Sequence, residues 1–260
     1  MASALIGGLI AKGFAPRSVA VIEVNPAARE RLAAQHGVRV TSAPDAATEM
    51  ADTLVLAVKP QDLRPALASI AATVRGKLVI SIAAGVRLEA LSRWLDGHLR
   101  IVRCMPNTPA LIGAGITGLY APPQVGPEDR KRAETILGAV GEFVWLGEER
   151  LLDPVTAVSA SGPAYVFWLI EQLAAFAEHS GIPKTDALKL AKQMVLGAAK
   201  LAVASDQAPD ALRKQVTSKG GTTEAALNVF SEEQLAERFA RALAAATRRG
   251  GELGGELGKD

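Results

Sequence analysis

The sequence predicts an α/β protein whose N-terminal domain is a doubly wound parallel sheet and whose C-terminal domain is entirely helical. Up to residue 152, short β-branched runs alternate with stretches of helical periodicity, which is typical of a sheet covered by helices on both faces. From Asp153 onward the β signal disappears. The 260 residues are enough for two medium-sized domains, which we expect at 1–152 and 153–260.

The first helical stretch lies at the start of the chain, MASALIGGLIAKGF. Leu5 and Leu9 recur at helical spacing, and the small residues Ala4, Gly7 and Gly8 would let this helix lie close against a sheet. Apolar, β-branched runs then predict strands at 18–24, 53–58, 77–83, 100–105, 116–121 and 142–146. Helical spacing predicts helices at 27–35, after Lys59-Pro60, and at 128–140.

The helical half contains one helix that is apolar nearly all round. Leu188 and Val195 mark one face of it, while Met194 and Leu201 lie on another. Such a helix must be buried, and a domain of about 100 residues has few places to bury it. We therefore expect a dimerisation domain with a helical interface between two copies. The low-complexity tail GGELGGELGKD is expected to be frayed.

Composition excludes several classes of function. Lys and Arg number 29 against 27 Asp and Glu, without a basic cluster, so nucleic acid is not an expected partner. Cys104 is the one cysteine, which excludes an internal disulfide and fits a reducing compartment; His36, His98 and His179 have no metal-ligand spacing. The uncharged run 154–170 is too short to span a membrane. We expect a soluble, cytoplasmic protein without a bound metal.

In a doubly wound sheet, ligands bind at the carboxyl ends of the strands. The first run ends at Glu23, whose carboxylate could accept hydrogen bonds from ribose hydroxyls, although an ordinary exposed acid explains it equally well. The next runs end in Ala57–Pro60, suited to a phosphate or ribose, and in Ala83–Gly85, which leaves room for a flat ring. Plain strand-to-helix turns are the alternative. In RCMPNTPA, two prolines fix the backbone around Asn107 and Thr108.

Two glycine-bearing stretches open helices in the helical half: Ser161-Gly162-Pro163 and Gly220–Thr223. The second suits a small carboxylate, because glycines allow close backbone approach and the first-turn N–H groups favour an anion. An N-cap Thr with Glu224 in the first turn explains it almost as well. No Ser-His-Asp, Cys-His or paired-carboxylate arrangement is apparent. We therefore expect chemistry that needs little acid or base, such as hydride transfer from a cofactor.

Five stretches in order carry a resemblance: AVKP (57–60), VISIAAG (79–85), RCMPNTPAL (103–111), TAVSASGPAY (156–165) and VTSKGGTTEAAL (216–227). Together they resemble the pyrroline-5-carboxylate reductase family, in register from Met1 to about Leu253. The resemblance implies a Rossmann-like dinucleotide-binding domain and reduction of 1-pyrroline-5-carboxylate to L-proline by NADPH or NADH, the last step of proline biosynthesis. It also implies a homodimer, or a decamer of five dimers.

Site roles follow from the same resemblance. Thr223 is the implied catalytic residue, its hydroxyl hydrogen-bonding the substrate nitrogen, and the partner subunit's helical domain completes the pocket. The implied substrate-binding residues are Ser161, Gly162, Gly220, Gly221, Thr222 and Thr223. The implied cofactor-binding residues are Glu23, Asn25, Ala57, Val58, Lys59, Pro60, Ala83, Ala84, Gly85, Pro106 and Asn107.

Three features depart from the family pattern. Lys219 and Ala160 replace residues usual at those positions. Glu23 favours NADH, whereas Asn25 and Arg29 keep NADPH open. Family members also begin with a strand and a glycine-rich phosphate-binding turn, and Met1-Ala2 aligns with the end of that turn. We expect the sheet to lack this first, central strand, which leaves its two neighbours without a shared partner, and we hypothesise that the working protein is longer.

Two other functions stay open at this point. One is a related two-domain dehydrogenase of another substrate, which would need a catalytic Lys near Tyr165 and Val166, where none precedes Lys184. The other is a degenerate, non-catalytic dimer that binds proline or a dinucleotide after losing its glycine loop.

Overall fold

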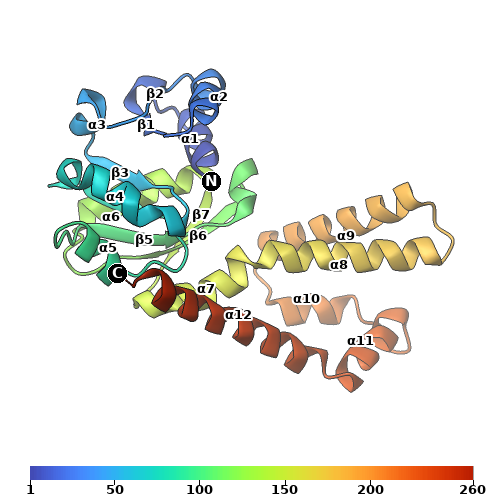
Figure 1. The fold of residues 1–260 in the computed structure, drawn as a ribbon. Coiled ribbons are helices and arrows are strands. Elements are labelled where there is room, and N and C mark those ends of the chain that lie inside the picture. The colour runs from blue at the N-terminus through green and yellow to red at the C-terminus, as the bar shows by residue number, and fades with distance from the viewer. Residues whose placement is uncertain (260) are drawn as a thin grey trace. The chain divides into compact units, whose positions relative to one another are not determined.

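A computed structural model describes residues 1–259 (Figure 1). They form two compact units: a sheet unit, Met1–Ser161 with the segment from Ala245 onward, and a helical unit, Gly162–Ala244. The division differs from the boundary expected between residues 152 and 153. Residues 153–160 belong to the sheet unit because Asp153 pairs with Arg87, and the backbone oxygen of Ser159 accepts a hydrogen bond from Asn107.

Five strands form the main sheet, in the order β3-β4-β5-β6-β7. Their bounds are β3 (Thr53–Leu56), β4 (Leu78–Ser81), β5 (Ile101–Met105), β6 (Gly115–Tyr120) and β7 (Gly141–Trp145). Leu78, Val79 and Ile80 of β4 are fully buried. Leu78 and Ile80 belong to one core cluster and Val79 to another, where it joins Leu63 and Leu67 of α4 (Pro60–Val74). The two clusters confirm a sheet covered on both faces.

Strand β6 is where the expectation of a parallel sheet is wrong. β3, β4 and β5 are parallel, but β6 runs antiparallel to β5. The connection from β5 to β6 contains only the short turn η2 (Thr108–Ile112), whereas a parallel neighbour needs a crossover of about a dozen residues or more. Helix α6 (Pro127–Leu137) supplies such a crossover, and β7 is therefore parallel to β6.

A second, two-stranded sheet pairs β1 (Ala20–Ile22) with β2 (Arg39–Thr41) in parallel. β1 and β3 thus lie in different sheets, as expected, and no strand of residues 1–259 pairs with both of them. Helix α1 (Ala2–Ala11) contributes Leu5 to the core of the large sheet and Ile6 to that of the small one. A Cβ on Gly8 would lie 2.6 Å from the Ala139 oxygen, so the close approach expected of α1 is to η3 (Gly138–Val140) rather than to a strand.

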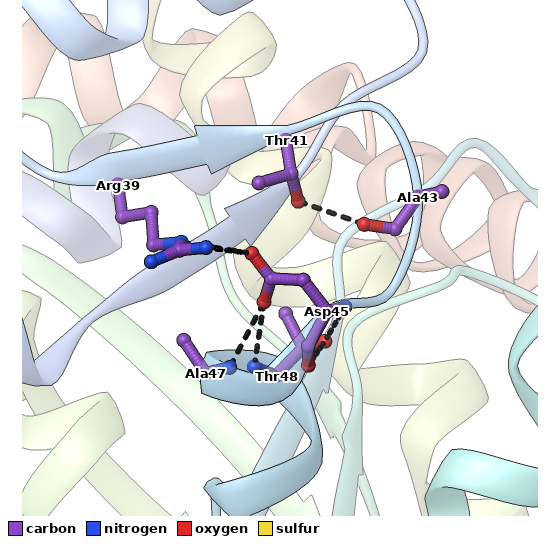
Figure 2. A network of polar contacts seen from close by, with 6 residues as sticks. All are labelled: Arg39, Thr41, Ala43, Asp45, Ala47 and Thr48. Atoms are coloured by element: carbon purple, nitrogen blue, oxygen red, sulfur yellow. Dashed lines mark hydrogen bonds and ion pairs between the residues drawn. The ribbon is translucent and has the colours of Figure 1, made fainter.

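The remaining elements of the sheet unit are η1 (Pro16–Ser18), α2 (Pro26–His36), α3 (Ala46–Met50), α5 (Leu88–Trp94), η4 (Glu149–Leu151), α7 (Leu152–Val155) and the π-helical turn η5 (Thr156–Ala160). Figure 2 shows how α3 begins: the Asp45 carboxylate accepts hydrogen bonds from the backbone N–H groups of Ala47 and Thr48 and from Arg39 of β2. The Thr48 backbone and the Arg39 guanidinium hold the pKa of Asp45 below its ordinary value.

The helical unit consists of α8 (Gly162–His179), α9 (Lys184–Ala204), α10 (Pro209–Gln215), α11 (Thr222–Glu232) and the first part of α12 (Leu235–Leu257). Ala187 and Ala191 are the only buried residues of positions 162–244. Large apolar side chains are exposed instead, among them Trp168 and Leu201, both 59% exposed, and Met194, 49% exposed. One copy of the chain does not bury the apolar helix found in the sequence.

The glycine-rich tail is helical rather than frayed as expected. Helix α12 continues to Leu257, and Gly254 is its one buried residue. A Cβ on Gly254 would lie 3.0 Å from the Gly85 oxygen and 2.9 Å from Arg87 Nε, so a glycine is required for this contact. Packing against the sheet unit therefore orders a segment whose composition is that of a flexible end.

Candidate functional site

The predicted cofactor residues of three strands meet at one edge of the main sheet. Leu56 of β3 pairs with Ser81 of β4, and Ser81 pairs with Arg103 of β5. Because these strands are parallel and in register, the turns 57–60, 82–85 and 106–107 all follow carboxyl ends at the same edge. This edge is where a doubly wound sheet binds its ligand.

The first two turns offer accessible backbone. Ala57, Val58 and Lys59 are exposed, Pro60 is the first residue of α4, and the N-cap residue Lys59 makes no side-chain capping bond. Pro60 has no N–H and the Asp62 N–H donates to the Lys59 oxygen at 3.0 Å, so an anion could bind only to the other N–H groups of the first turn. Gly85 has φ +78, a conformation that favours glycine, and the partly exposed Ala84 precedes it. Ala83 is buried against the core.

The side chain of Asn107 makes two hydrogen bonds to distant backbone groups, which the sequence did not predict. Its side-chain oxygen accepts a hydrogen bond from the Ile116 backbone N–H at 3.0 Å, and its Nδ2 donates to the Ser159 oxygen at 3.2 Å. Asn107 is 8% exposed, and Pro106 beside it is buried. The amide thus ties the turn after β5 to β6 and to η5. Wide π-turns such as η5 often lie at functional sites.

Glu23 and Asn25 follow β1, in the small sheet. Glu23 Oε1 accepts a hydrogen bond from the Asn25 N–H at 2.9 Å, and the Asn25 side chain caps α2 through the Ala28 N–H at 3.0 Å. Arg29 Nη1 donates to the backbone oxygens of Glu23 and Val24. Glu23 Oε2 has no hydrogen-bond partner among residues 1–259, so it is the oxygen available to a ribose hydroxyl.

The predicted substrate loop, Gly220–Thr223, opens α11. Gly220 has φ +72 and Gly221 is the N-cap, so the alternative of a Thr N-cap is not observed. The Gly220 N–H already donates to Glu224 Oε2 at 2.7 Å, and the Gly221 N–H donates to the Ser218 oxygen. Thr222 is exposed and Thr223 partly exposed. A carboxylate at this helix start is thus present already, supplied by the chain itself.

Ser161 and Gly162 form the step between η5 and α8. The Ser161 N–H donates to the Thr156 oxygen and closes the π-turn, and Gly162 is the first residue of α8. Both residues are partly exposed. Ser161 belongs to the sheet unit, whereas Gly162 and the loop 220–223 belong to the helical unit.

Four charged residues near the cofactor edge were not predicted from the sequence. Arg103 pairs with Glu149, and Arg87 pairs with Asp153. The signal was present, since an arginine inside a buried strand such as IVRCM needs a partner. Among residues 1–259, no group of three or more metal-ligating side chains gathers, and no helix has both the length and the apolarity to cross a membrane.

Comparison with known proteins gives two family matches. Residues 149–253 match the model described as pyrroline-5-carboxylate reductase dimerisation, and residues 1–85 match that of NADP oxidoreductase coenzyme F420-dependent. The pyrroline-5-carboxylate reductase of Pseudomonas aeruginosa is 39% identical over 260 residues, all of this chain and 95% of that protein. The chain belongs to the pyrroline-5-carboxylate reductase family. This full-length match does not favour a degenerate binder or a dehydrogenase of another substrate.

Other pyrroline-5-carboxylate reductases are similar to this chain in sequence and in structure. The pyrroline-5-carboxylate reductase of Synechocystis is 42% identical over 255 residues, covering 98% of this chain and 95% of that protein. The solved structure of a pyrroline-5-carboxylate reductase from Coxiella burnetii superposes with a TM-score of 0.91 at 38% identity, over 97% of this chain and 94% of that one. The Plasmodium falciparum pyrroline carboxylate reductase, solved with NADP bound, gives 0.84 at 26% identity, over 97% and 94%.

Proposed function

We propose that this chain reduces 1-pyrroline-5-carboxylate to L-proline, the last step of proline biosynthesis, with NADPH or NADH as the hydride donor. One observation carries the proposal: the full-length family match includes both the three turns at the sheet edge and the glycine loop at the start of α11. The chemistry needs no strong acid or base, which fits a site built mostly from backbone and small side chains.

The sheet edge fits a dinucleotide. Ala57–Pro60 would place a helix N-terminus against phosphate or ribose, and the small side chains of the turn Ala83–Gly85, where the end of α12 packs on Gly85, would face the flat ring. Pro106 and Asn107 would form the neighbouring wall. Glu23 would accept from the adenosine ribose, which favours NADH, while Asn25 and Arg29 beside it keep NADPH open. When bound, the dinucleotide supplies the hydride.

The glycine loop would hold the substrate. Thr223 would share a hydrogen bond between its hydroxyl and the substrate ring nitrogen. Gly220, Gly221 and Thr222 would turn backbone N–H groups to the carboxylate, and the Gly221 N–H would leave the Ser218 oxygen to do so. The family resemblance also implies a substrate-binding role for Ser161 and Gly162. Since Glu224 already bonds the Gly220 N–H, a substrate carboxylate would share or replace that contact. Fixing nitrogen and carboxylate together orients the imine carbon toward the hydride donor.

The assembly proposed is a homodimer, in which the partner's helical domain completes the substrate pocket, with a decamer of five dimers as the larger form. The exposed apolar side chains of α8 and α9 support the dimer. The proposal places the reaction in the cytoplasm, in keeping with a single, buried cysteine, and includes neither nucleic acid nor membrane as partner.

The test is oxidation of NADPH and of NADH by the purified 260-residue chain, with and without 1-pyrroline-5-carboxylate. Turnover that depends on the substrate, with L-proline as product, is the expected result. Cofactor binding without turnover would contradict the proposal.

Thr223→Ala assigns the catalytic role. We expect kcat to fall roughly 100-fold, because the substrate nitrogen loses its orienting partner, while the Kd of the dinucleotide changes little. Thr217→Ala is the matched control, since that hydroxyl already donates to the Arg213 oxygen at 2.7 Å. Equal activities of the two variants would remove Thr223 from the mechanism.

A further inference from the structure

A buried arginine lies beside the cofactor edge. Arg103 of β5 is paired in register with Ser81, the last residue of β4, and its side chain is 5% exposed. Burial lowers the pKa of Arg103, and the neighbouring Glu149 carboxylate opposes that change. A cation in this position requires a fixed anionic partner, because leaving it unpaired out of water is costly.

The partner of Arg103 also holds the start of α5. Glu149 Oε1 accepts from Arg103 Nη1 at 2.5 Å and from the Leu88 backbone N–H at 2.7 Å. Leu88 is the first residue of α5, so its N–H has no acceptor within the helix. One carboxylate oxygen thus joins the strand β5 to the far end of the turn 82–87, whose near end is β4.

Two further contacts involve the turn 82–87. Arg87 Nη2 pairs with Asp153 Oδ2 at 2.5 Å, with side-chain exposures of 26% and 15%. A Cβ on Gly85 would lie 3.2 Å from Leu257 Cδ1, so the end of α12 packs directly on the turn. Ala83, Ala84 and Gly85 themselves contribute little side chain. Their position is therefore set by groups around them.

We propose that Glu149, held by Arg103, is a positioning residue that fixes the turn 82–87 in the conformation that receives the dinucleotide. The inference rests on the proposed function in so far as it takes this turn as the cofactor's. Glu149 acts through the Leu88 N–H, from which it accepts a hydrogen bond at 2.7 Å. The Arg87–Asp153 pair holds the last residue of the same turn.

Glu149→Gln is the first test, because it keeps the shape of the side chain and removes the charge that neutralises Arg103. We expect both the Kd and the KM for NADPH or NADH to rise roughly tenfold, since the turn loses its fixed position. The KM for the pyrroline substrate at saturating cofactor should change less than about twofold. Amide hydrogen exchange at residues 82–88 should accelerate. Glu148→Gln, in the exposed pair with Arg150, is the matched control and should change none of these.

A double variant separates positioning from stability. Arg103→Met with Glu149→Leu replaces the buried pair by apolar groups, which often preserves stability, and it removes the acceptor of the Leu88 N–H. The proposal requires unfolding near the wild-type temperature with weak cofactor binding and fast exchange at Leu88. Recovery of cofactor affinity together with stability would show a merely structural pair and overturn it, as would unchanged exchange and affinity in Glu149→Gln.

The outcomes also separate this inference from the proposed function. A wild-type chain that binds NADPH or NADH but does not reduce 1-pyrroline-5-carboxylate defeats the proposed function, while Kd and hydrogen exchange still decide the role of Glu149. A wild-type chain that binds neither dinucleotide overturns both.

Discussion

The two units of the chain bury their apolar residues differently. In the sheet unit, all four residues of β4 are buried and both faces of the sheet are covered within one copy. In the helical unit, α8 has no buried residue, and Trp168 and Leu201 remain 59% exposed. The sheet unit therefore contains its core in one copy, whereas the helical unit presents half of an interface. The match of residues 149–253 to a dimerisation family agrees with this difference.

The largest effect should come from placing a charge on the exposed apolar face. Trp168→Glu would bury an unpaired carboxylate in the proposed dimer at a cost on the order of 3 kcal/mol or more, which weakens association more than about 100-fold. Sedimentation velocity against concentration measures it. Glu171→Gln, an exposed change on the same helix, should leave the dimer intact. A fully dimeric Trp168→Glu protein would place the interface elsewhere.

The next largest effect should be a loss of stability in the sheet unit alone. Leu63 is fully buried under β4, so Leu63→Ala should lower the free energy of unfolding by about 2–5 kcal/mol through lost burial and a cavity. Urea unfolding at fixed protein concentration gives the value. Ile112→Ala, at a side chain 83% exposed, should cost less than about 0.5 kcal/mol. If Leu63→Ala also dissociated the dimer, the two units would not be as independent as their burial indicates.

A smaller change in stability is expected from two neighbouring glycines of one helix, α12. Gly254→Ala should destabilise by about 1–3 kcal/mol, because the added Cβ meets the Gly85 oxygen at 3.0 Å. Gly255→Ala next to it meets nothing within 4 Å and should stabilise by up to about 1 kcal/mol through helix propensity. Thermal unfolding of the two variants checks the pair. Equal shifts would mean that the tail does not pack on the turn.

Most helices and strands could be predicted from hydrophobic periodicity, because a pattern that extends over many residues is little affected by any single residue. Every expected strand is present, but β2, α3 and α5 were missed, since three to seven residues carry too weak a pattern. The antiparallel β6 depends on loop length rather than on strand composition. The prediction of a frayed tail was wrong because glycine is typical of flexible segments. In the structure, Gly254 instead allows a close backbone contact with Gly85.

The site was predictable where chemistry depends on local backbone. The turns after β3, β4 and β5 are marked by proline and glycine, and the register of the strands then brings them to one edge. The buried strand around Arg103 indicates that this arginine needs an anionic partner, but the sequence does not show that the partner is Glu149, which lies 46 positions away. The same holds for the link from Asn107 to Ser159.

The smallest effect concerns the surface of the sheet unit, where Asp45 joins β2 to α3 (Figure 2). Its pKa is held below the ordinary value, first by the Thr48 backbone N–H and also by Arg39, so the folded state favours the ionised carboxylate. The stabilisation is therefore complete above the unfolded pKa and is lost as the pH falls through the folded one. Asp45→Ala should lower the unfolding temperature at neutral pH, and the gap to wild type should shrink below about pH 4. Glu30→Ala, which removes an exposed carboxylate from α2, is the control at the same pH values. A gap that stays constant into acid would assign the effect of Asp45 to the geometry of the cap rather than to its charge.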